Sequence, residues 1–279
     1  MIVRRLGIGL RGNLPLGEYG RLGRMAEDLG FDVVSAFHDL GDQPALVPLL
    51  EVARVTRRVS LGPACLNPYT MHPVEIVSAI QVLETVSDGR AYLGLARGAW
   101  LDGVGIDQSD AVERVRAAAE FVLSRLDVPL LIGGWGPRMV ALAGEIATEL
   151  KVGGSANAGI VPIMRARLGS SRTGIVLGAV TVVDADREAA RARARAAVQH
   201  YFEVVARFDP TLSGQPAGVT DELLDRFAFA GTPDDVTRQV NEVFAAGATR
   251  VEFGAPFGLD LQRGLRLLGE RVLPRVSRE

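Results

Sequence analysis

The sequence has few of the residues that build several common kinds of site. It contains one cysteine, Cys65, which excludes a disulfide within the chain, and one lysine, Lys151, which excludes Schiff-base chemistry anywhere else. Its three histidines show no metal-ligand spacing, and no G-x-S-x-G motif is present. We therefore expect no disulfide framework, no bound metal and no serine hydrolase.

Charge and hydropathy argue against further classes of protein. A formal net charge of −2 over 279 residues gives no electrostatic reason to expect nucleic acid or a membrane surface as a partner. No apolar run approaches the ~20 residues that span a bilayer, and the N-terminus does not read as a signal peptide. A single cysteine fits a reducing compartment, so the protein is expected to be cytoplasmic.

Strand-like and helix-like stretches alternate along the whole chain. This alternation favours a single TIM barrel, (β/α)8, over residues 1–279. A doubly wound Rossmann-type sheet is the alternative, but no G-x-G-x-x-G follows the first strand. Two later segments, 186–208 and 221–229, are each predicted to be one helix. The predicted strands are 3–10, 31–37, 58–66, 90–96, 128–132, 149–153, 174–183 and 250–254.

Ligands of a TIM barrel bind at the carboxyl ends of its strands. After the second strand come His38 and Asp39, and after the fourth come Arg97 and Trp100. A histidine at a strand end can accept, donate or shuttle a proton near neutral pH, so His38 is the predicted catalytic residue. The alternative is a histidine that only caps a turn. Asp39, Arg97 and Trp100 are predicted to contact substrate.

The third strand leads into a turn that is rich in proline. Pro63, Pro68 and Pro73 end the strand and begin the next helix, and Asn67 and Tyr69 lie between them. Such a turn forms either a ligand wall or a rigid connection without a ligand.

A second turn, after the fifth strand, is rich in glycine. Gly133, Gly134 and Gly136 flank Trp135, and the helix that follows carries Arg138 in its first turn. Glycines let the backbone approach a ligand, and the free N–H groups of a helix start attract an anion. Arg138 could add a charge-assisted contact to a phosphate, or it could simply point to water.

Both turns resemble a known family. The run Asn67-Pro-Tyr-Thr-Met-His-Pro73 resembles the N-P-Y-T-R-H-P signature of the luciferase-like superfamily, with Met71 in place of the arginine. The run from Ile132 to Ala147 resembles the pattern A-A-x-G-P-K-M-x-x-L-A-G-E-I-A of the same superfamily. The similar branch uses the deazaflavin coenzyme F420 and contains methylenetetrahydromethanopterin reductase.

The resemblance implies an F420-dependent oxidoreductase that transfers a hydride between the deazaflavin and a small organic substrate. It implies a cis peptide bond at Ala64–Cys65 that supports the ring together with Asn67, and His38 as the acid/base or substrate anchor. It also implies a homodimer. The cofactor phosphate would be held by the turn after the fifth strand, through Gly133, Gly134, Trp135, Gly136 and Arg138.

Two departures from the family pattern bear on function. Ala99 stands where the F420-dependent dehydrogenases of the resembling family carry an acidic residue. The family usually has a longer segment before the fifth strand, and its absence here between residues 126 and 128 shortens the insertion region. Two alternatives therefore stay open beside F420 chemistry. One is a monooxygenase of the same superfamily that uses FMN, and the other is a homologue that binds a cofactor without catalysis.

Overall fold

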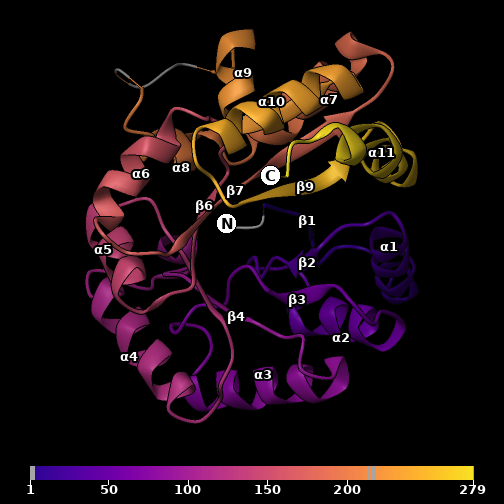
Figure 1. Ribbon diagram of the computed structural model, residues 1–279. Coiled ribbons are helices and arrows are strands. Elements are labelled where there is room, and N and C mark those ends of the chain that lie inside the picture. The colour runs from indigo at the N-terminus through magenta and orange to yellow at the C-terminus, as the bar shows by residue number, and fades with distance from the viewer. Residues whose placement is uncertain (1–3, 213, 215–217, 279) are drawn as a thin grey trace.

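The strands of the protein curl into a nearly closed barrel (Figure 1). The structure is a computed structural model that describes residues 4–212, 214 and 218–278. The ring consists of β1 (Arg5–Leu10), β2 (Val33–Ala36), β3 (Ser60–Pro63), β4 (Leu93–Leu95), β5 (Leu130–Gly133), β6 (Glu149–Gly153), β7 (Gly174–Val183) and β9 (Arg250–Phe257). Within the described residues these strands pair in parallel in the order β3-β2-β1-β9-β7-β6-β5-β4. Isolated bridges from Leu61 to Ala91 and from Leu66 to Leu95 join the two ends of this order.

The TIM-barrel prediction is therefore confirmed, and the doubly wound alternative is wrong, because the sheet returns to its own first edge. All eight predicted strands form, although the predicted start of the first one, Val3, lies outside the described residues. The insertion region is short, as predicted. Only residues 124–129 join helix α4 (Ala111–Leu123) to β5.

Helices cover the outside of the ring on all sides (Figure 1). Their apolar faces and the outward side chains of the strands form one large buried cluster, which is the main core of the fold. Besides α4, the helices of the described residues are α1 (Leu16–Asp28), α2 (Leu46–Val55), α3 (Pro73–Ser87), α5 (Pro137–Ile146), α6 (Ile160–Leu168), α7 (Arg187–Gln199), α8 (Phe202–Ala206), α9 (Asp221–Phe227), α10 (Pro233–Ala245) and α11 (Leu261–Leu267). Shorter turns are η1 (Leu101–Val104), η2 (Leu268–Val272) and η3 (Leu273–Arg275).

Two predicted helices are wrong in extent. The segment 186–208 forms two helices, because the chain turns after Gln199 and the ring of Phe202 packs edge-on against Phe227, with 5.4 Å between ring centroids. The segment 221–229 ends its helix at Phe227, and residues 228–231 form a further strand, β8 (Ala228–Gly231), beside β7. The side-chain amide of Gln239 bonds to the backbone of β8, which helps to hold the strand extended.

The inside of the barrel contains charged and polar side chains, and glycines on the strands leave space for larger neighbouring side chains. Lys151 on β6 donates to Glu252 on β9, and the hydroxyl of Ser35 donates to the same carboxylate. Burial alone would raise the pKa of Glu252, but the charges of Lys151 and Arg250 hold it below its usual value. Glycine is required at Gly9, since a Cβ there would lie 2.4 Å from the ring of Phe37.

Candidate active site

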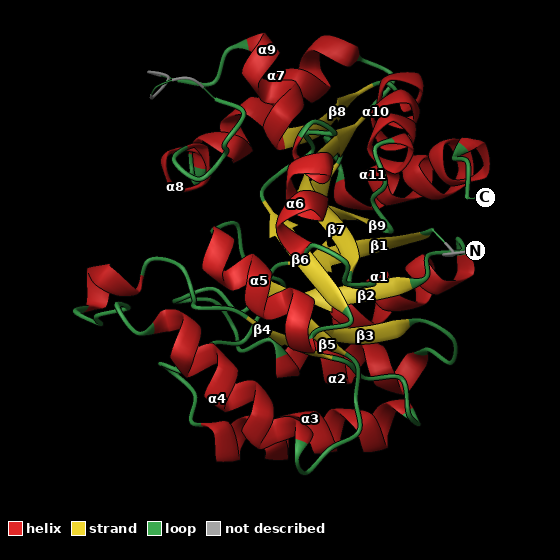
Figure 2. Cartoon of the chain, turned by 60° about the vertical axis from the view of Figure 1, so that its left-hand side comes forward, coloured by secondary structure: helices red, strands yellow, loops and turns green. Residues whose placement is uncertain are grey.

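The carboxyl ends of the strands form one end of the barrel, on the side where α8 and the loop after β4 lie in Figure 2. The bond between Ala64 and Cys65 is a cis peptide, as the resemblance implied. The N–H of Ala64 donates to the carbonyl of Ala36 on β2 at 2.8 Å, and the N–H of Leu66 donates to the carbonyl of Gly94 on β4 at 2.9 Å. The chain therefore crosses from one neighbouring strand to the other at this bond.

The turn after β5 lies directly beside this bond. A Cβ at Gly133 would come within 3.0 Å of the sulfur of Cys65 and 3.2 Å of Ala96. Two segments that the sequence analysis assigned to one cofactor, 64–65 and 133–136, are thus brought together. Burial raises the pKa of the Cys65 thiol to about 12, so the sulfur stays protonated and is not a nucleophile at neutral pH.

The start of α5 is open to a ligand. No side chain caps it, and a Cβ at Gly136 would meet no atom within 4 Å. The indole N–H of Trp135 donates to the carbonyl of Gly153 at 3.0 Å, which fixes the ring over the end of β6. Arg138 is exposed and forms an ion pair with Glu113 of α4. An exposed pair of this kind holds the arginine only weakly, so it can turn to an anion.

Asn67 is buried and organises the turn after β3. Its side-chain oxygen accepts hydrogen bonds from the N–H groups of Tyr69 at 3.1 Å and Thr70 at 2.9 Å. The hydroxyl of Tyr69 donates to Asp110, 2.6 Å away, and His72 caps α3. The turn is rigid because its own polar groups hold it, and the oxygen of Asn67 is used for that purpose.

His38 points toward the surrounding helices. Its Nδ1 accepts from the N–H of Ala45 at 3.3 Å, and burial lowers the pKa of the imidazole, which is therefore neutral at neutral pH. The ring borders an apolar cavity of about 30 Å³ together with Pro63 and side chains of α2 and α3. The catalytic role of His38 stays a prediction.

The sequence analysis missed the neighbour of His38. The ring of Phe37, and not the imidazole, lies over the interior of the barrel, against Gly9 and 5.0 Å from the amine of Lys151. The strand alternation that places Val33 and Ser35 inside also places Phe37 there. The chain's single lysine, placed with Glu149 in the short strand at 149–153, was a signal that could have indicated a polar interior.

Asp39 lies among charges at the same end of the barrel. Burial raises the pKa of its carboxyl group and so does the charge of Asp42, while Arg11 and Lys151 act in the opposite direction. Asp42 itself is paired with Arg11, the two atoms lying 2.7 Å apart. Asp39 is therefore a carboxyl group that holds its proton more tightly than an exposed one.

Arg97 and Trp100 line one cavity of about 450 Å³. The opposite wall comes from Val204 and Arg207 at the end of α8, and the guanidinium of Arg97 stacks 5.3 Å from the ring of Phe208. Burial and the charge of Arg207 lower the pKa of Arg97. The wall from α8 was missed, since residues 186–208 were interpreted as one solvated helix.

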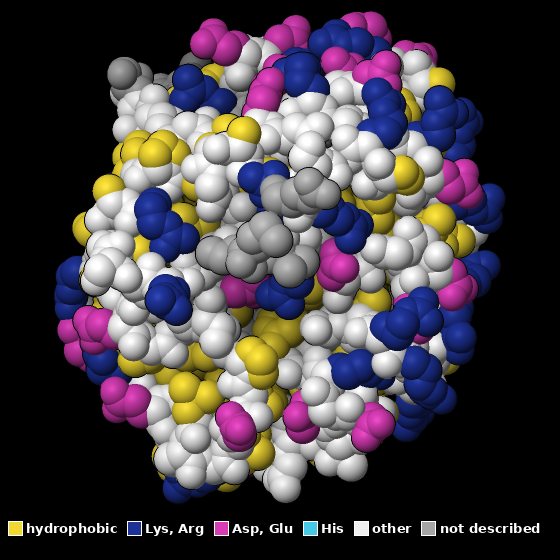
Figure 3. Space-filling view, in the orientation of Figure 1, with side chains coloured by type: hydrophobic (Ala, Val, Ile, Leu, Met, Phe, Trp, Pro, Cys, Tyr) yellow, Lys and Arg dark blue, Asp and Glu magenta, His cyan; other side chains and the backbone are white. Residues whose placement is uncertain are grey.

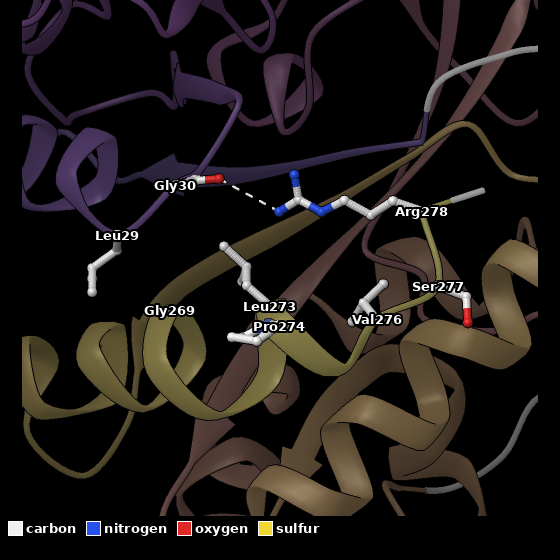
Figure 4. Close-up of a pocket in the computed structure, with 8 residues that line it drawn as sticks. All are labelled: Leu29, Gly30, Gly269, Leu273, Pro274, Val276, Ser277 and Arg278. Atoms are coloured by element: carbon white, nitrogen blue, oxygen red, sulfur yellow. Dashed lines mark hydrogen bonds between the residues drawn. The ribbon is translucent and has the colours of Figure 1, made fainter.

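Another cavity, of about 560 Å³, lies between the end of α1 and the C-terminal segment (Figure 4). Its one charged lining residue is Arg278, which donates to the carbonyl of Gly30 at 3.4 Å. It lacks a group for acid–base chemistry, and its residues Leu29 and Gly30 precede β2, away from the carboxyl ends of the strands. In the described part of the chain, no group of three or more His, Cys, Asp or Glu side chains could hold a metal ion, and no helix is long and apolar enough to cross a membrane.

Comparison of the sequence with known protein families shows to which family the chain belongs. The sequence matches the family described as luciferase-like monooxygenase over residues 2–126 and 111–250. The chain belongs to this family. The two matching parts overlap in and just after α4, next to the predicted gap in the insertion region.

Three relatives of this luciferase-like protein are informative. The 5,10-methylenetetrahydromethanopterin reductase of Archaeoglobus fulgidus is 28% identical, and the alignment covers 91% of this chain and 94% of the relative. The F420-dependent glucose-6-phosphate dehydrogenase of Nakamurella multipartita is also 28% identical, with 93% and 92% covered. The coenzyme F420 dependent tetrahydromethanopterin reductase of Methanopyrus kandleri superposes with a TM-score of 0.83 at 22% identity, covering 99% of this chain and 100% of that chain. The last likeness shows the fold.

Proposed function

We propose that this luciferase-like protein is an F420-dependent oxidoreductase that transfers a hydride between the deazaflavin and a small organic substrate. The observation that carries the proposal is the contact between Cys65 and Gly133, which brings the bond after β3 and the turn after β5 to one place. A flat ring can lie against the first, and a phosphate can bind at the second. Support also comes from two relatives with different substrates, one named as F420-dependent and the other a methylenetetrahydromethanopterin reductase.

The residues present fit the cofactor. Ala64, Cys65 and the rigid turn at Asn67 would support the ring. The uncapped start of α5 would hold the phosphate through backbone N–H groups, with Gly133, Gly134 and Gly136 permitting close approach and Arg138 leaving Glu113 to bind it. Trp135, fixed by its bond to Gly153, would form a side wall. When bound, F420 would supply the hydride chemistry.

The substrate would enter through the cavity beside Arg97 and Trp100. Because the guanidinium groups of Arg97 and Arg207 both border this cavity, a substrate with polar or anionic groups fits it well. We propose that Asp39 contacts the substrate. Because its pKa is raised, it would donate or accept the proton in place of the acidic residue that related dehydrogenases carry at the position of Ala99. A methylenetetrahydromethanopterin-like pterin is one candidate substrate among small organic molecules.

In this proposal His38 has a different role from the one that its sequence position suggested. The imidazole borders Pro63 behind β3, so it would hold the segment that backs the ring rather than face the substrate. His38→Ala should then weaken F420 binding, whereas Asp39→Asn should leave binding intact and lower turnover. The opposite pattern would restore His38 as the catalytic group. Turnover would be followed by deazaflavin fluorescence against a pterin, secondary alcohols and glucose 6-phosphate.

The family name favours a second candidate, an FMN-dependent monooxygenase. Oxygen consumption with reduced FMN, but no turnover with F420, would support it. A homologue without catalysis would bind F420 and turn over none of the substrates. A homodimer stays a prediction; the exposed Val74 and Val82 on α3 are apolar side chains that it could cover. A cytoplasmic location and the absence of a nucleic-acid partner also stay predictions.

A further inference from the structure

The amino ends of the strands form the other end of the barrel, and a cavity of about 490 Å³ opens there. Figure 3 looks onto this end, where basic side chains lie around a hollow near the centre of the face. The cavity is separated from the candidate active site by the buried layer of Lys151 and Glu252. The charged and aromatic side chains that line it are Arg5, Arg90, Tyr92, Glu149, Arg172 and Arg250.

Arg250 is the buried donor of this cavity. Its side chain is 1% exposed, and its Nη1 lies 3.3 Å from an oxygen of Glu149. Its Nε and Nη2 have no hydrogen-bond partner in the described residues, and both atoms are shielded from solvent in this structure. The nearest carboxylate oxygen to Nη2, on Glu252, is 4.0 Å away, and Glu252 already accepts from Lys151 and Ser35. Leaving buried guanidinium donors without an acceptor costs free energy, so an acceptor for Nε and Nη2 of Arg250 would stabilise the protein.

The cavity also carries an excess of positive charge. Four arginines line it against one carboxylate, Glu149, which Arg5 and Arg250 share. Arg172 is exposed, and no carboxylate of the described residues lies within ion-pair distance of it. Arg90 adds charge but no free donor, because its guanidinium already donates to backbone or hydroxyl oxygens of Ala53, Thr56, Val59 and Ser87.

We propose that this end of the barrel is a binding site for a small oxyanion, a phosphate or carboxylate group carried by an organic molecule. To bind the oxyanion, the guanidinium of Arg250 turns from Glu252 toward the cavity and donates through Nε and Nη2, and Arg172 contacts the oxyanion from the rim. Tyr92, Pro129 and Leu131 supply an apolar wall for the rest of the ligand, for which the cavity leaves room. The site does not depend on the proposed F420 chemistry, because none of its residues lies at the carboxyl ends of the strands.

The test uses untagged full-length protein, free of cofactor, and inorganic phosphate as the probe. Thermal unfolding and calorimetric titration are measured in phosphate and in potassium chloride of equal ionic strength. Phosphate, but not chloride, should raise the melting temperature in a saturable way. Arg172→Gln should weaken phosphate binding about tenfold, the effect of losing one charge-assisted contact. Arg250→Lys, which keeps the charge and removes the two free donors, should weaken it at least as much.

Two controls locate the effect. Arg138→Gln removes the arginine at the opposite end of the barrel, and Arg24→Gln removes an exposed charge on α1. Arg24→Gln should bind phosphate as the unchanged protein does, and Arg138→Gln should keep the part of the binding that Arg172→Gln removes. The proposal is overturned if phosphate acts no differently from chloride, if Arg172→Gln binds it normally, or if the effect disappears in Arg138→Gln. The last result would place the phosphate at α5 and would support the cofactor site instead.

Discussion

The amine of Lys151 donates to the carboxylate of Glu252 inside the barrel, where the two residues are 5% and 1% exposed. The pair lies between the two ends of the barrel. Phe37 and the candidate active site lie on one side of it, and Arg250, whose Nε and Nη2 have no acceptor in the described residues, lies on the other. Because both charges are out of water, each depends on its partner.

The first prediction concerns this pair. Lys151→Met leaves the Glu252 charge buried without its main partner and should lower the free energy of unfolding by about 3–5 kcal/mol. The double variant Lys151→Met, Glu252→Gln should recover much of that loss, since the unpaired charge is gone. Urea unfolding of the three proteins measures both values. Equal losses in the single and double variants would contradict a coupled pair.

The second prediction separates two glycines of the turn after β5. Gly133→Ala brings a methyl group within 3.0 Å of the Cys65 sulfur and should cost about 1–3 kcal/mol of stability. Gly136→Ala meets no atom within 4 Å and should change stability by less than about 0.5 kcal/mol. If a phosphate lies at the start of α5, the same Gly136→Ala change should still weaken F420 binding about tenfold. Unchanged F420 affinity in this variant would contradict a phosphate site at the start of α5.

The third prediction concerns pH. Burial and Asp42 raise the pKa of Asp39, so the folded protein holds this proton more tightly than the unfolded chain. Ionised Asp39 therefore lowers stability at neutral pH, and this penalty fades as the pH falls through the folded pKa toward about 4. Asp39→Asn should raise the melting temperature at pH 7 and bring no gain near pH 4.

Asp107 offers the control for that measurement. Hydrogen bonds from Ser109 hold the pKa of this exposed carboxyl below its usual value. Asp107→Asn should therefore bring no gain in melting temperature at pH 7. A gain of the same size in both variants would mean that general surface charge, rather than the burial of Asp39, is responsible.

Much of the fold could be predicted from the sequence, because the signals were local. Gly153 ends β6 as expected, although β3 ends at Pro63 and not at the predicted residue 66. Thr232 with Asp235 forms the capping box that begins α10. The cis bond at Ala64–Cys65 was also located in advance, although through the family resemblance and not through the physics of the residues.

The parts that could not be predicted depend on contacts between distant segments. The break before α8 follows from packing between Phe202 and Phe227, and β8 forms because β7 extends far enough to pair with it. The side on which His38 and Phe37 project depends on the register of β2 in the ring, where one residue of difference exchanges inside and outside.

The most direct test of the proposed function is the binding of cofactor to the purified apoprotein. F420 and FMN are titrated separately and binding is read by fluorescence, with His38→Ala and Gly136→Ala as companions. We predict saturable binding of F420, weaker in both variants, and no binding of FMN at the same concentrations. Preference for FMN, or failure of F420 to bind, would contradict the proposal.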